Sequence, residues 1–381
     1  MQACSAIVCR MLPPAVADAI DPAGVRRALV IKLRHHGDVL LASPVFSVLK
    51  RRAPQAEVDA LVYHDTAPML EGHPSISFIH TIDRSLKRQG VLAQMRGEWQ
   101  LWQALRERHY DLVVHLTEHP RGAWLKRLVG ARFGVARERD DAGWWWRSSF
   151  SHRYLLPRGT LRHTVETNLD ALRRIGWWPE DNDKALVLVP GAEAETRARS
   201  LLQAHGLTRG RFLLVHPGSR WLFKCWPPTS TAALLDRLAD AGWPLVMTGA
   251  PDHAERALVS AIKSAARATI IDLSGQLSLP ELAALIGNAR LFIGVDSAPM
   301  HIAAAMRTPV VALFGPSGDA EWGPWMVPHR VVASTSHPCR PCGNNGCGGS
   351  NHSDCLLTLP EARVGAAVDE LLAATENLRR R

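Results

Sequence analysis

The chain has 381 residues, of which 46% are hydrophobic and 21% charged, and its formal net charge is +9. This length exceeds what one hydrophobic core usually serves, so two domains are expected, and the composition excludes a largely disordered chain. No run of 18 or more uncharged apolar residues is present, which excludes an ordinary membrane-spanning helix.

The first 24 residues are interpreted as a poorly ordered leader rather than a secretion signal. They lack a basic start, and Arg10, Pro13, Pro14 and Asp18 interrupt their apolar stretch. We therefore expect a cytoplasmic protein whose seven cysteines are thiols in a reducing compartment.

The positive charge is concentrated in the first half of the chain. Residues 1–180 hold 26 of the 45 Lys and Arg residues but only 18 of the 36 Asp and Glu residues. A basic half favours an acidic partner such as nucleic acid, anionic lipid head groups or a phosphorylated glycan, although a solvated basic surface explains the charge equally well.

In chain order, the first half alternates short apolar runs with helical patterns. The apolar runs predict buried strands at residues 27–33, 58–62, 76–82 and 111–116. The helical patterns cover residues 39–50 and 92–108. Strands that alternate with helices predict a parallel sheet with helices on both of its faces.

A turn-rich acidic segment, WWPEDND at residues 177–183, interrupts this pattern. A second series of expected strands follows at 212–215, 245–248, 269–273, 291–295 and 310–314, with helices at 231–241 and 280–288. The predicted architecture is α/β, with two Rossmann-like domains that face each other across a central cleft. They comprise residues 25–178 and 191–381, joined by a linker at 179–190.

Ligands of an open α/β sheet bind beyond the carboxyl ends of its strands, so the residues after each expected strand are informative. The first strand is followed by Arg34-His35-His36-Gly37-Asp38, in which Gly37 permits a tight turn and Asp38 opens the next helix. Asp38 either caps that helix or serves catalysis from a strand-to-helix loop.

The expected strand at 212–215 is followed by His216-Pro217-Gly218-Ser219-Arg220 and then by Lys224. Backbone amides, a hydroxyl and an ammonium at such a loop suit a diphosphate, and a plain turn is the alternative. The segment is not a P-loop, because the glycine and lysine spacing of that motif is missing.

The expected strand at 291–295 is followed by Asp296 and Ser297, with His301 one helical turn further on. The start of a helix attracts anions through its free amides and its dipole. Asp296 suits the hydroxyl groups of a sugar better than a phosphate, and His301 is either a donor to the diphosphate or a structural residue.

Three segments carry a resemblance to a known family: GDVLLASP after the first strand, HPGSR-x-x-x-K-x-WP in the second half, and GVDSAPMHIAAA near the end. Together they resemble glycosyltransferase family 9, the bacterial lipopolysaccharide heptosyltransferases, in the expected order from residue 28 to 357. The HPGS form and the late cysteine-rich segment look most like heptosyltransferase III, which adds a branch heptose to the second core heptose.

The resemblance implies a GT-B fold whose first domain binds the acceptor and whose second domain binds an ADP-heptose donor. It also implies inversion at the anomeric carbon without a metal ion or cofactor. Asp38 matches the family's general base, Lys224 its donor-phosphate lysine and Asp296 the carboxylate that holds the donor heptose.

The remaining donor-binding residues are also carried over from the resemblance. Gly218 and Ser219 fall where the family binds the diphosphate, and Glu255 matches its ribose-binding glutamate, with Asp252 as a close competitor. The same donor site is expected to include Arg220, Ser297, Ala298 and His301. Ala298 stands where the family commonly has glycine, which puts sugar affinity or choice in doubt.

The acceptor, the inner core of lipopolysaccharide, is expected to bind a groove that uses His36, Arg121 and neighbouring basic residues. We also expect the enzyme to rest, as a peripheral protein, on the cytoplasmic leaflet of the inner membrane. The basic half contains tryptophans that suit sugar faces or a membrane interface, although core packing explains them equally well: Trp99, Trp102, Trp124 and Trp144–Trp146.

Two other interpretations follow from the same residues. A GT-B transferase or epimerase acting on another nucleotide sugar keeps the fold, and preference for UDP over ADP would favour it. A nucleic-acid-binding protein explains the basic half, but the sequence has no recognisable nucleic-acid motif, so we expect no such partner.

Cys339, Cys342, Cys347 and Cys355 form a C-x₂-C-x₄-C-x₇-C pattern in a segment rich in Gly and Asn. Their number suits a structural metal site, but the spacing matches no common zinc finger. Metal analysis of protein purified without a His tag distinguishes a bound metal from free thiols.

Overall fold

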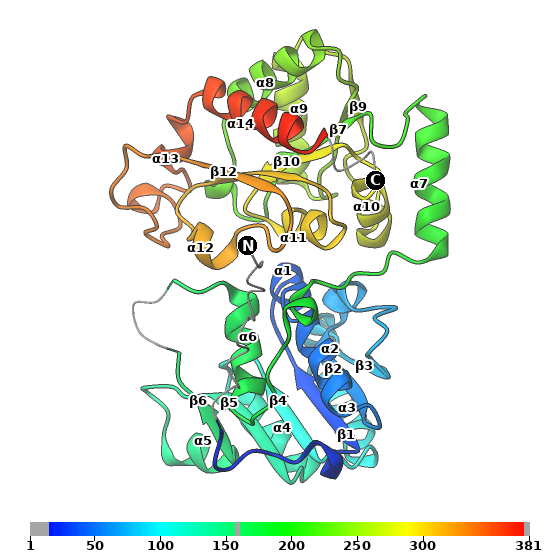
Figure 1. Cartoon of the computed structure of the whole chain (residues 1–381), viewed down its shortest axis with the longest axis vertical. Helices are drawn as coiled ribbons and strands as arrows, with labels where there is room; N and C mark the ends of the chain where they lie inside the picture. The colour runs from blue at the N-terminus through cyan, green and yellow to red at the C-terminus, as the bar shows by residue number, and fades with distance from the viewer. Residues whose placement is uncertain (1–14, 157–160, 377–381) are drawn as a thin grey trace, which may run out of the picture.

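The computed structural model describes residues 15–156 and 161–376, which form two stacked α/β domains (Figure 1). The strands of the first domain are β1 (Arg27–Ile31), β2 (Glu57–Tyr63), β3 (Phe78–Ile82), β4 (Leu112–His115), β5 (Phe133–Arg137) and β6 (His152–Tyr154). Those of the second are β7 (Leu213–His216), β8 (Leu245–Met247), β9 (Ile270–Asp272), β10 (Leu291–Val295), β11 (Val310–Phe314) and β12 (His329–Ala333).

Both sheets are parallel and have the same topology. Their strand orders are β3-β2-β1-β4-β5-β6 and β12-β11-β10-β7-β8-β9, so each follows the 3-2-1-4-5-6 order of dinucleotide-binding sheets. In such a sheet the order reverses beside the first strand, and ligands bind at the carboxyl ends of the two strands at that point. The two switch points lie between β1 and β4 and between β7 and β10.

Helices cover both faces of each sheet. The first domain has α1 (His36–Leu40), α2 (Ser43–Arg52), α3 (Val91–Glu107), α4 (Arg121–Val129), α5 (Trp144–Ser149) and α6 (Thr164–Arg173). The second has α7 (Ala192–Ala204), α8 (Pro228–Asp240), α9 (His253–Ala265), α10 (Leu279–Ile286), α11 (Ala298–Ala305), α12 (Asp319–Trp322), α13 (Asp354–Leu357) and α14 (Glu361–Ala374). Short 3-10 helices are η1 (Pro22–Gly24), η2 (His64–Met69), η3 (Arg84–Arg88), η4 (Asp181–Lys184), η5 (Leu222–Lys224) and η6 (Cys347–Gly349).

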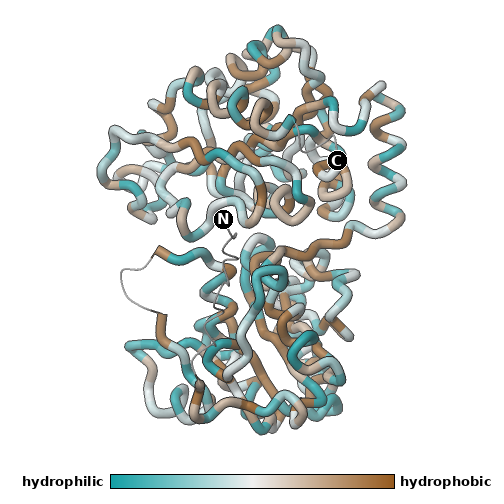
Figure 2. The backbone as a smooth tube through the Cα atoms, in the orientation of Figure 1, coloured by the Kyte–Doolittle hydropathy of each residue, from teal (hydrophilic) through white to brown (hydrophobic). Residues whose placement is uncertain are grey.

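The strands are almost continuously apolar because both faces of each sheet are buried. In β1, Ala28 and Val30 pack into the cluster that includes α2 and α6, whereas Leu29 and Ile31 pack with α3 and α4 on the opposite face. Figure 2 shows the resulting hydrophobic centre of each domain within a more hydrophilic outer layer. Among the described residues, no helix has the length and apolar character needed to cross a membrane.

Three strands were not predicted from the sequence, namely β5, β6 and β12. The segments FGVAR, HRY and HRVVA carry polar or small residues that break an apolar run, and the last two lie at sheet edges, where fewer neighbours bury them. The single helix expected at 39–50 is two helices, because the chain bends after Leu40 and Pro44 begins a new helix at α2.

Residues 1–24 were expected to be a poorly ordered leader, but the last ten of them pack on the first domain. Residues 1–14 lie outside the described part. Ile20 is buried, and its carbonyl oxygen accepts a hydrogen bond from the indole of Trp177 at 2.8 Å. Arg174 forms an ion pair with Asp18 at 2.7 Å. The ordering comes from these long-range partners, which local sequence does not reveal.

The expected linker at 179–190 begins on the first domain. Helix η4 packs against α2, and the backbone amide of Val187 donates to Ser43 Oγ at 3.0 Å. The chain therefore passes from the first domain to the second within the last few residues before Ala192, where α7 begins. Figure 1 shows α7 beside the second domain.

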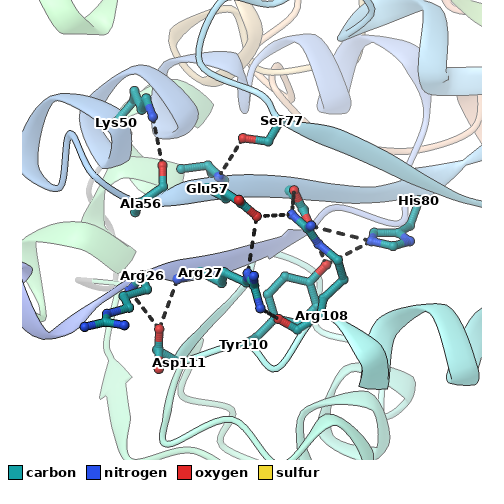
Figure 3. Close-up of polar contacts among 12 residues, drawn as sticks. Arg26, Arg27, Lys50, Ala56, Glu57, Ser77, His80, Arg108, Tyr110 and Asp111 are labelled. Atoms are coloured by element: carbon teal, nitrogen blue, oxygen red, sulfur yellow. Dashed lines mark hydrogen bonds and ion pairs between the residues drawn. The ribbon is translucent and has the colours of Figure 1, made fainter.

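A buried polar network lies near the amino ends of the first domain's strands (Figure 3). The carboxylate of Asp59 is fully buried and accepts hydrogen bonds from Arg108 Nε at 2.8 Å and from the Tyr110 hydroxyl at 2.7 Å. His80 Nε2 hydrogen-bonds to the same hydroxyl at 2.8 Å. Burial alone raises the pKa of Asp59, but hydrogen bonds from His80, Arg108 and Tyr110 outweigh it and hold that pKa below its usual value.

Candidate active site

Two cavities lie at the switch points and share Asp38. The larger has a volume of about 770 Å³ and is lined mainly by the second domain, with the loop before α1 closing one side. The smaller, of about 430 Å³, is lined mainly by the first domain. Arg34, Asp38 and Trp322 line both, so a molecule in either cavity meets the same carboxylate.

In the larger cavity, the loop after β7 places Gly218 against the helix α9. A Cβ atom at Gly218 would overlap with the carboxylate of Glu255, so only glycine allows this approach. Glu255 is 5% exposed, and it accepts a hydrogen bond from the backbone amide of Ala250 at 2.8 Å and faces His216 Nε2 at 3.5 Å. Burial raises its pKa, but His216 and that amide outweigh burial and lower it, so Glu255 is ionised.

Lys224 and Asp296 form an ion pair across the same cavity, between η5 and the carboxyl end of β10. Lys224 Nζ donates to Asp296 Oδ2 at 2.6 Å, with 21% and 8% of the two side chains exposed. Ser219 is buried beside them and also lines the cavity. The positive end of the eight-residue helix α11 begins two residues after Asp296, so an anion in this cavity meets an ammonium and a helix start.

The two domains touch where α1 meets α11. A Cβ atom at Gly37 would lie 2.9 Å from Cδ2 of His301, so the histidine ring occupies the space that a side chain would need. Burial lowers the pKa of His301 to about 4, even though Asp296 and Asp38 oppose the shift, and the ring is therefore neutral near pH 7. Its Nδ1 is buried without a hydrogen-bond partner among the described residues.

Asp38 lies in the first turn of α1 and is half-buried. Neither a hydrogen bond nor an ion pair engages its carboxylate within the described part of the chain. The N-cap position belongs to His35, so Asp38 does not cap the helix as the alternative interpretation had it. A free carboxylate between two cavities is suited to accept a proton from a bound hydroxyl.

The smaller cavity contains basic residues that the sequence did not single out. Lys32, at the end of β1, is 5% exposed, and its Nζ donates to the carbonyl oxygen of Leu116 at 3.2 Å and to Asn168 Oδ1 at 3.1 Å. Arg137 and Arg162 lie on the same wall. Lys32 belongs to the apolar run that predicts the first strand. Arg162 lies just before α6, and Asn168 lies on α6. No local sequence pattern indicated these three residues as part of a site.

The expected acceptor residues are not brought together. His36 lines the larger cavity and hydrogen-bonds through Nε2 to the backbone oxygen of Asp65 at 2.8 Å. Arg121 begins α4, pairs with Glu98 at 2.5 Å, and lines a third hollow between α3 and β3. Neither lies on the wall of the smaller cavity.

The expected donor residues, by contrast, line one cavity together: Gly218, Ser219, Arg220, Lys224, Asp252, Glu255, Asp296, Ser297, Ala298 and His301. Asp252 and Glu255 differ in their roles. Asp252 is exposed and caps α9 by accepting from the amides of Ala254 and Glu255, at 3.0 and 3.1 Å, whereas Glu255 is buried at the cavity wall. Arg220 reaches across the cleft, and its Nη1 hydrogen-bonds to Nδ1 of His35 at 3.0 Å.

Comparison with known proteins identifies the family. The model of Glycosyltransferase family 9 (heptosyltransferase) matches residues 98–351. Lipopolysaccharide heptosyltransferase 3 of Escherichia coli is 34% identical over 350 residues, which cover 90% of this chain and 98% of that protein. The chain belongs to glycosyltransferase family 9.

Solved structures give the fold of this family 9 chain. The glycosyl transferase family 9 protein of Veillonella parvula superposes with a TM-score of 0.79 at 23% identity, covering 94% of this chain and all of the other. E. coli ADP-heptose lps heptosyltransferase II superposes with a TM-score of 0.72 at 21% identity, covering 92% and 99%. The predicted GT-B fold and the resemblance to family 9 are both confirmed, and the chain is a heptosyltransferase.

The cysteine-rich segment of this family 9 enzyme lies after β12. Cys339, Cys342 and Cys347 are exposed thiols, and Cys355 is buried at α13. Within residues 15–156 and 161–376, no three His, Cys, Asp or Glu side chains are arranged to hold a metal ion. The structural metal inferred from the cysteine count therefore stays a prediction.

Proposed function

We propose that this heptosyltransferase transfers heptose from ADP-heptose to the inner core of lipopolysaccharide, as the branch heptose on the second core heptose. The observation that carries the proposal is the unpartnered Asp38 carboxylate where the two cavities meet. The larger cavity would hold ADP-heptose and the smaller one the acceptor. The printed names of E. coli heptosyltransferase 3 and of ADP-heptose lps heptosyltransferase II support these substrates.

Four polar side chains of the larger cavity have a role in this proposal. Glu255 accepts hydrogen bonds from the ribose hydroxyls of ADP, and Lys224, Ser219 and the start of α11 bind the diphosphate. Asp296 accepts hydrogen bonds from hydroxyl groups of the heptose. Lys224 would leave its ion pair with Asp296, or share it, when the diphosphate enters, because the two anions compete for one ammonium.

The transfer is a single displacement. The acceptor oxygen attacks the anomeric carbon from the face opposite the diphosphate while its proton passes to Asp38, a role typically worth about 10²–10⁴ in rate. The bond from the anomeric carbon to the diphosphate oxygen breaks, and ADP leaves with the electron pair. Lys224 and the helix start stabilise the developing negative charge, so that neither a metal ion nor a cofactor takes part.

We further propose that the enzyme acts at the cytoplasmic face of the inner membrane, where a lipid-linked acceptor is found. Large apolar side chains are exposed on the first domain, among them Leu92 at 84%, Trp144 at 79%, and Trp99 and Trp124 at 57% each. Exposed aromatic rings beside arginines suit a membrane interface. Co-sedimentation with vesicles that is independent of their anionic lipid content would contradict this location.

The experiment that tests the proposed function measures ADP release by the purified enzyme given ADP-heptose, with and without lipopolysaccharide truncated after its first two heptoses. Release that depends on this acceptor is expected. Release only with a heptose-free core would move the enzyme to an earlier step. Absence of release with both acceptors would contradict the proposed donor, and UDP that inhibits better than ADP would point to another nucleotide sugar.

A further inference from the structure

Trp322 is an aromatic side chain at the boundary between the two cavities. It ends α12 in the second domain, yet it lines both the larger cavity and the smaller one, as Asp38 does. Of the described residues that line the smaller cavity, two are aromatic, and the other one, Tyr154, is only 8% exposed. Trp322 is half-buried and has the larger ring, so it offers more aromatic surface than Tyr154.

The residues after Trp322 attach its segment to the first domain. The backbone amide of Val165 donates to Nδ1 of His163 at 3.2 Å, so Nε2 of that ring carries the proton. This Nε2 donates to the carbonyl oxygen of Gly323 at 2.9 Å. The ring of Trp325 stacks on His163, with the ring centroids 4.3 Å apart. The position of Trp322 is therefore fixed by contacts of its neighbours with the other domain.

These contacts join two walls of the smaller cavity. His163 directly precedes α6, and Thr164 and Thr167 of that helix line the cavity together with Trp322. The wall formed by α6 belongs to the first domain, and the wall formed by α12 belongs to the second. A molecule in the smaller cavity therefore meets both domains as well as the carboxylate of Asp38.

The indole N–H of Trp322 is not used in a hydrogen bond within the described residues. In contrast, the indole nitrogens of Trp177, Trp226 and Trp325 each donate to a backbone carbonyl oxygen, at 2.8, 3.1 and 2.7 Å. A ring with an unused N–H beside polar side chains suits a sugar. The C–H groups on one face of a sugar pack on an aromatic ring, and its hydroxyl oxygens accept from the N–H.

We propose that Trp322 is the aromatic platform on which the acceptor sugar stacks, and that this contact positions the acceptor hydroxyl beside Asp38. Because the platform comes from the second domain, the acceptor site is complete only where the two domains meet. The donor domain would then take part in choosing the acceptor. This inference rests on the proposed function, because it assigns the smaller cavity to the acceptor.

The test compares Trp322→Leu and Trp322→Phe with wild type in the ADP-release assay, with the acceptor and ADP-heptose varied separately. In Trp322→Leu the KM for the acceptor should rise about tenfold, because the aromatic contact is lost. Trp322→Phe keeps an aromatic face and should show a smaller rise. The KM for ADP-heptose and the dissociation constant for ADP should match wild type in both variants.

A control variant and a measurement of folding keep the test decisive. Trp243→Leu removes another half-buried tryptophan of the second domain, which also packs on a hydrophobic cluster but lines neither cavity. It should leave the KM for the acceptor unchanged. Thermal unfolding detects a folding defect, and Trp322→Phe decides the question if Trp322→Leu folds poorly.

Two results would overturn the platform. One is a wild-type KM for the acceptor in the folded Trp322 variants, and the other is a KM for ADP-heptose that rises as much as the KM for the acceptor. A failure of the proposed function is recognised separately, because wild type itself would then show no ADP release that depends on the acceptor.

Discussion

The two ends of the first domain's sheet each contain an aspartate, and the two carboxylates differ in burial and in hydrogen bonding. Near the amino ends of the strands, Asp59 is fully buried and held by Arg108, Tyr110 and His80. At the carboxyl ends, Asp38 is half-buried and has no partner among the described residues. The same chemical group therefore serves stability at one end and remains available for a substrate proton at the other, and each assignment predicts effects that the other does not.

The largest expected effect is on the rate of the Asp38→Asn variant. Transfer should fall by about 10²–10⁴, because the amide cannot take the acceptor proton. The dissociation constant for ADP and the thermal unfolding midpoint should stay near the wild-type values, since no hydrogen bond or ion pair within the described residues involves the carboxylate. Asp65→Asn, which breaks an exposed pair with Arg84, is the matched control. Loss of ADP binding in Asp38→Asn would contradict its role as a base.

Asp59→Ala should show the reverse pattern. Removing one member of a buried charged network typically costs about 3–5 kcal/mol of unfolding free energy, and here it also leaves Tyr110 and Arg108 without their shared acceptor. Urea unfolding measures this loss. The kcat of the folded fraction should equal that of wild type, and a lower kcat would show that the network also positions the cleft.

Lys224 of the second domain is intermediate between Asp38 and Asp59, because it is in an ion pair and also lines a cavity. Lys224→Met should weaken ADP binding by about tenfold to a hundredfold, the range expected for loss of a hydrogen bond to a charged group. Calorimetric titration with ADP measures it. Lys263→Met breaks a similar pair with Asp272, at 2.9 Å, and neither of these side chains lines the cavity, so this variant should leave ADP affinity unchanged. Equal affinity in both variants would remove Lys224 from the phosphate site.

A further expected effect concerns buried histidines. Burial lowers the pKa of His73 and His301 to about 4 and that of His115 to about 3. The unfolded chain, with pKa values near 6.5, binds more protons between these limits, so stability falls as the pH drops from about 6.5 towards 4. Each histidine contributes up to about 1.4 kcal/mol per pH unit.

Urea unfolding between pH 7 and pH 5 measures the histidine effect. His115→Gln should show a shallower decline than wild type, because one proton-binding group of the unfolded chain is gone. His253→Gln, at the exposed start of α9, should not show the same change. Identical slopes in wild type and His115→Gln would contradict the buried, neutral state of that histidine.

Sequence reasoning grouped residues that line the larger cavity together and missed much of the lining of the smaller cavity, for a physical reason. Gly218 and Asp296 directly follow strands, and Lys224 lies in η5 a few residues after β7, so their positions in the chain already place them near a switch point. The smaller cavity is assembled from residues whose approach depends on tertiary packing, such as Lys32 within an apolar strand and Asn168 on α6. The two expected acceptor residues, His36 and Arg121, were chosen for charge and proximity, and those properties do not determine which cavity a side chain lines.

The topology has a consequence for engineering. All strands of one sheet come from residues 27–154 and all strands of the other from residues 213–333, and the chain passes between the domains just before α7. A chimaera joined near residue 190 would thus exchange a complete first domain, with most of the smaller cavity's lining, without cutting either sheet. What such a hybrid must preserve is the contact of α1 with α11, where a residue larger than glycine at position 37 would force the ring of His301 to shift.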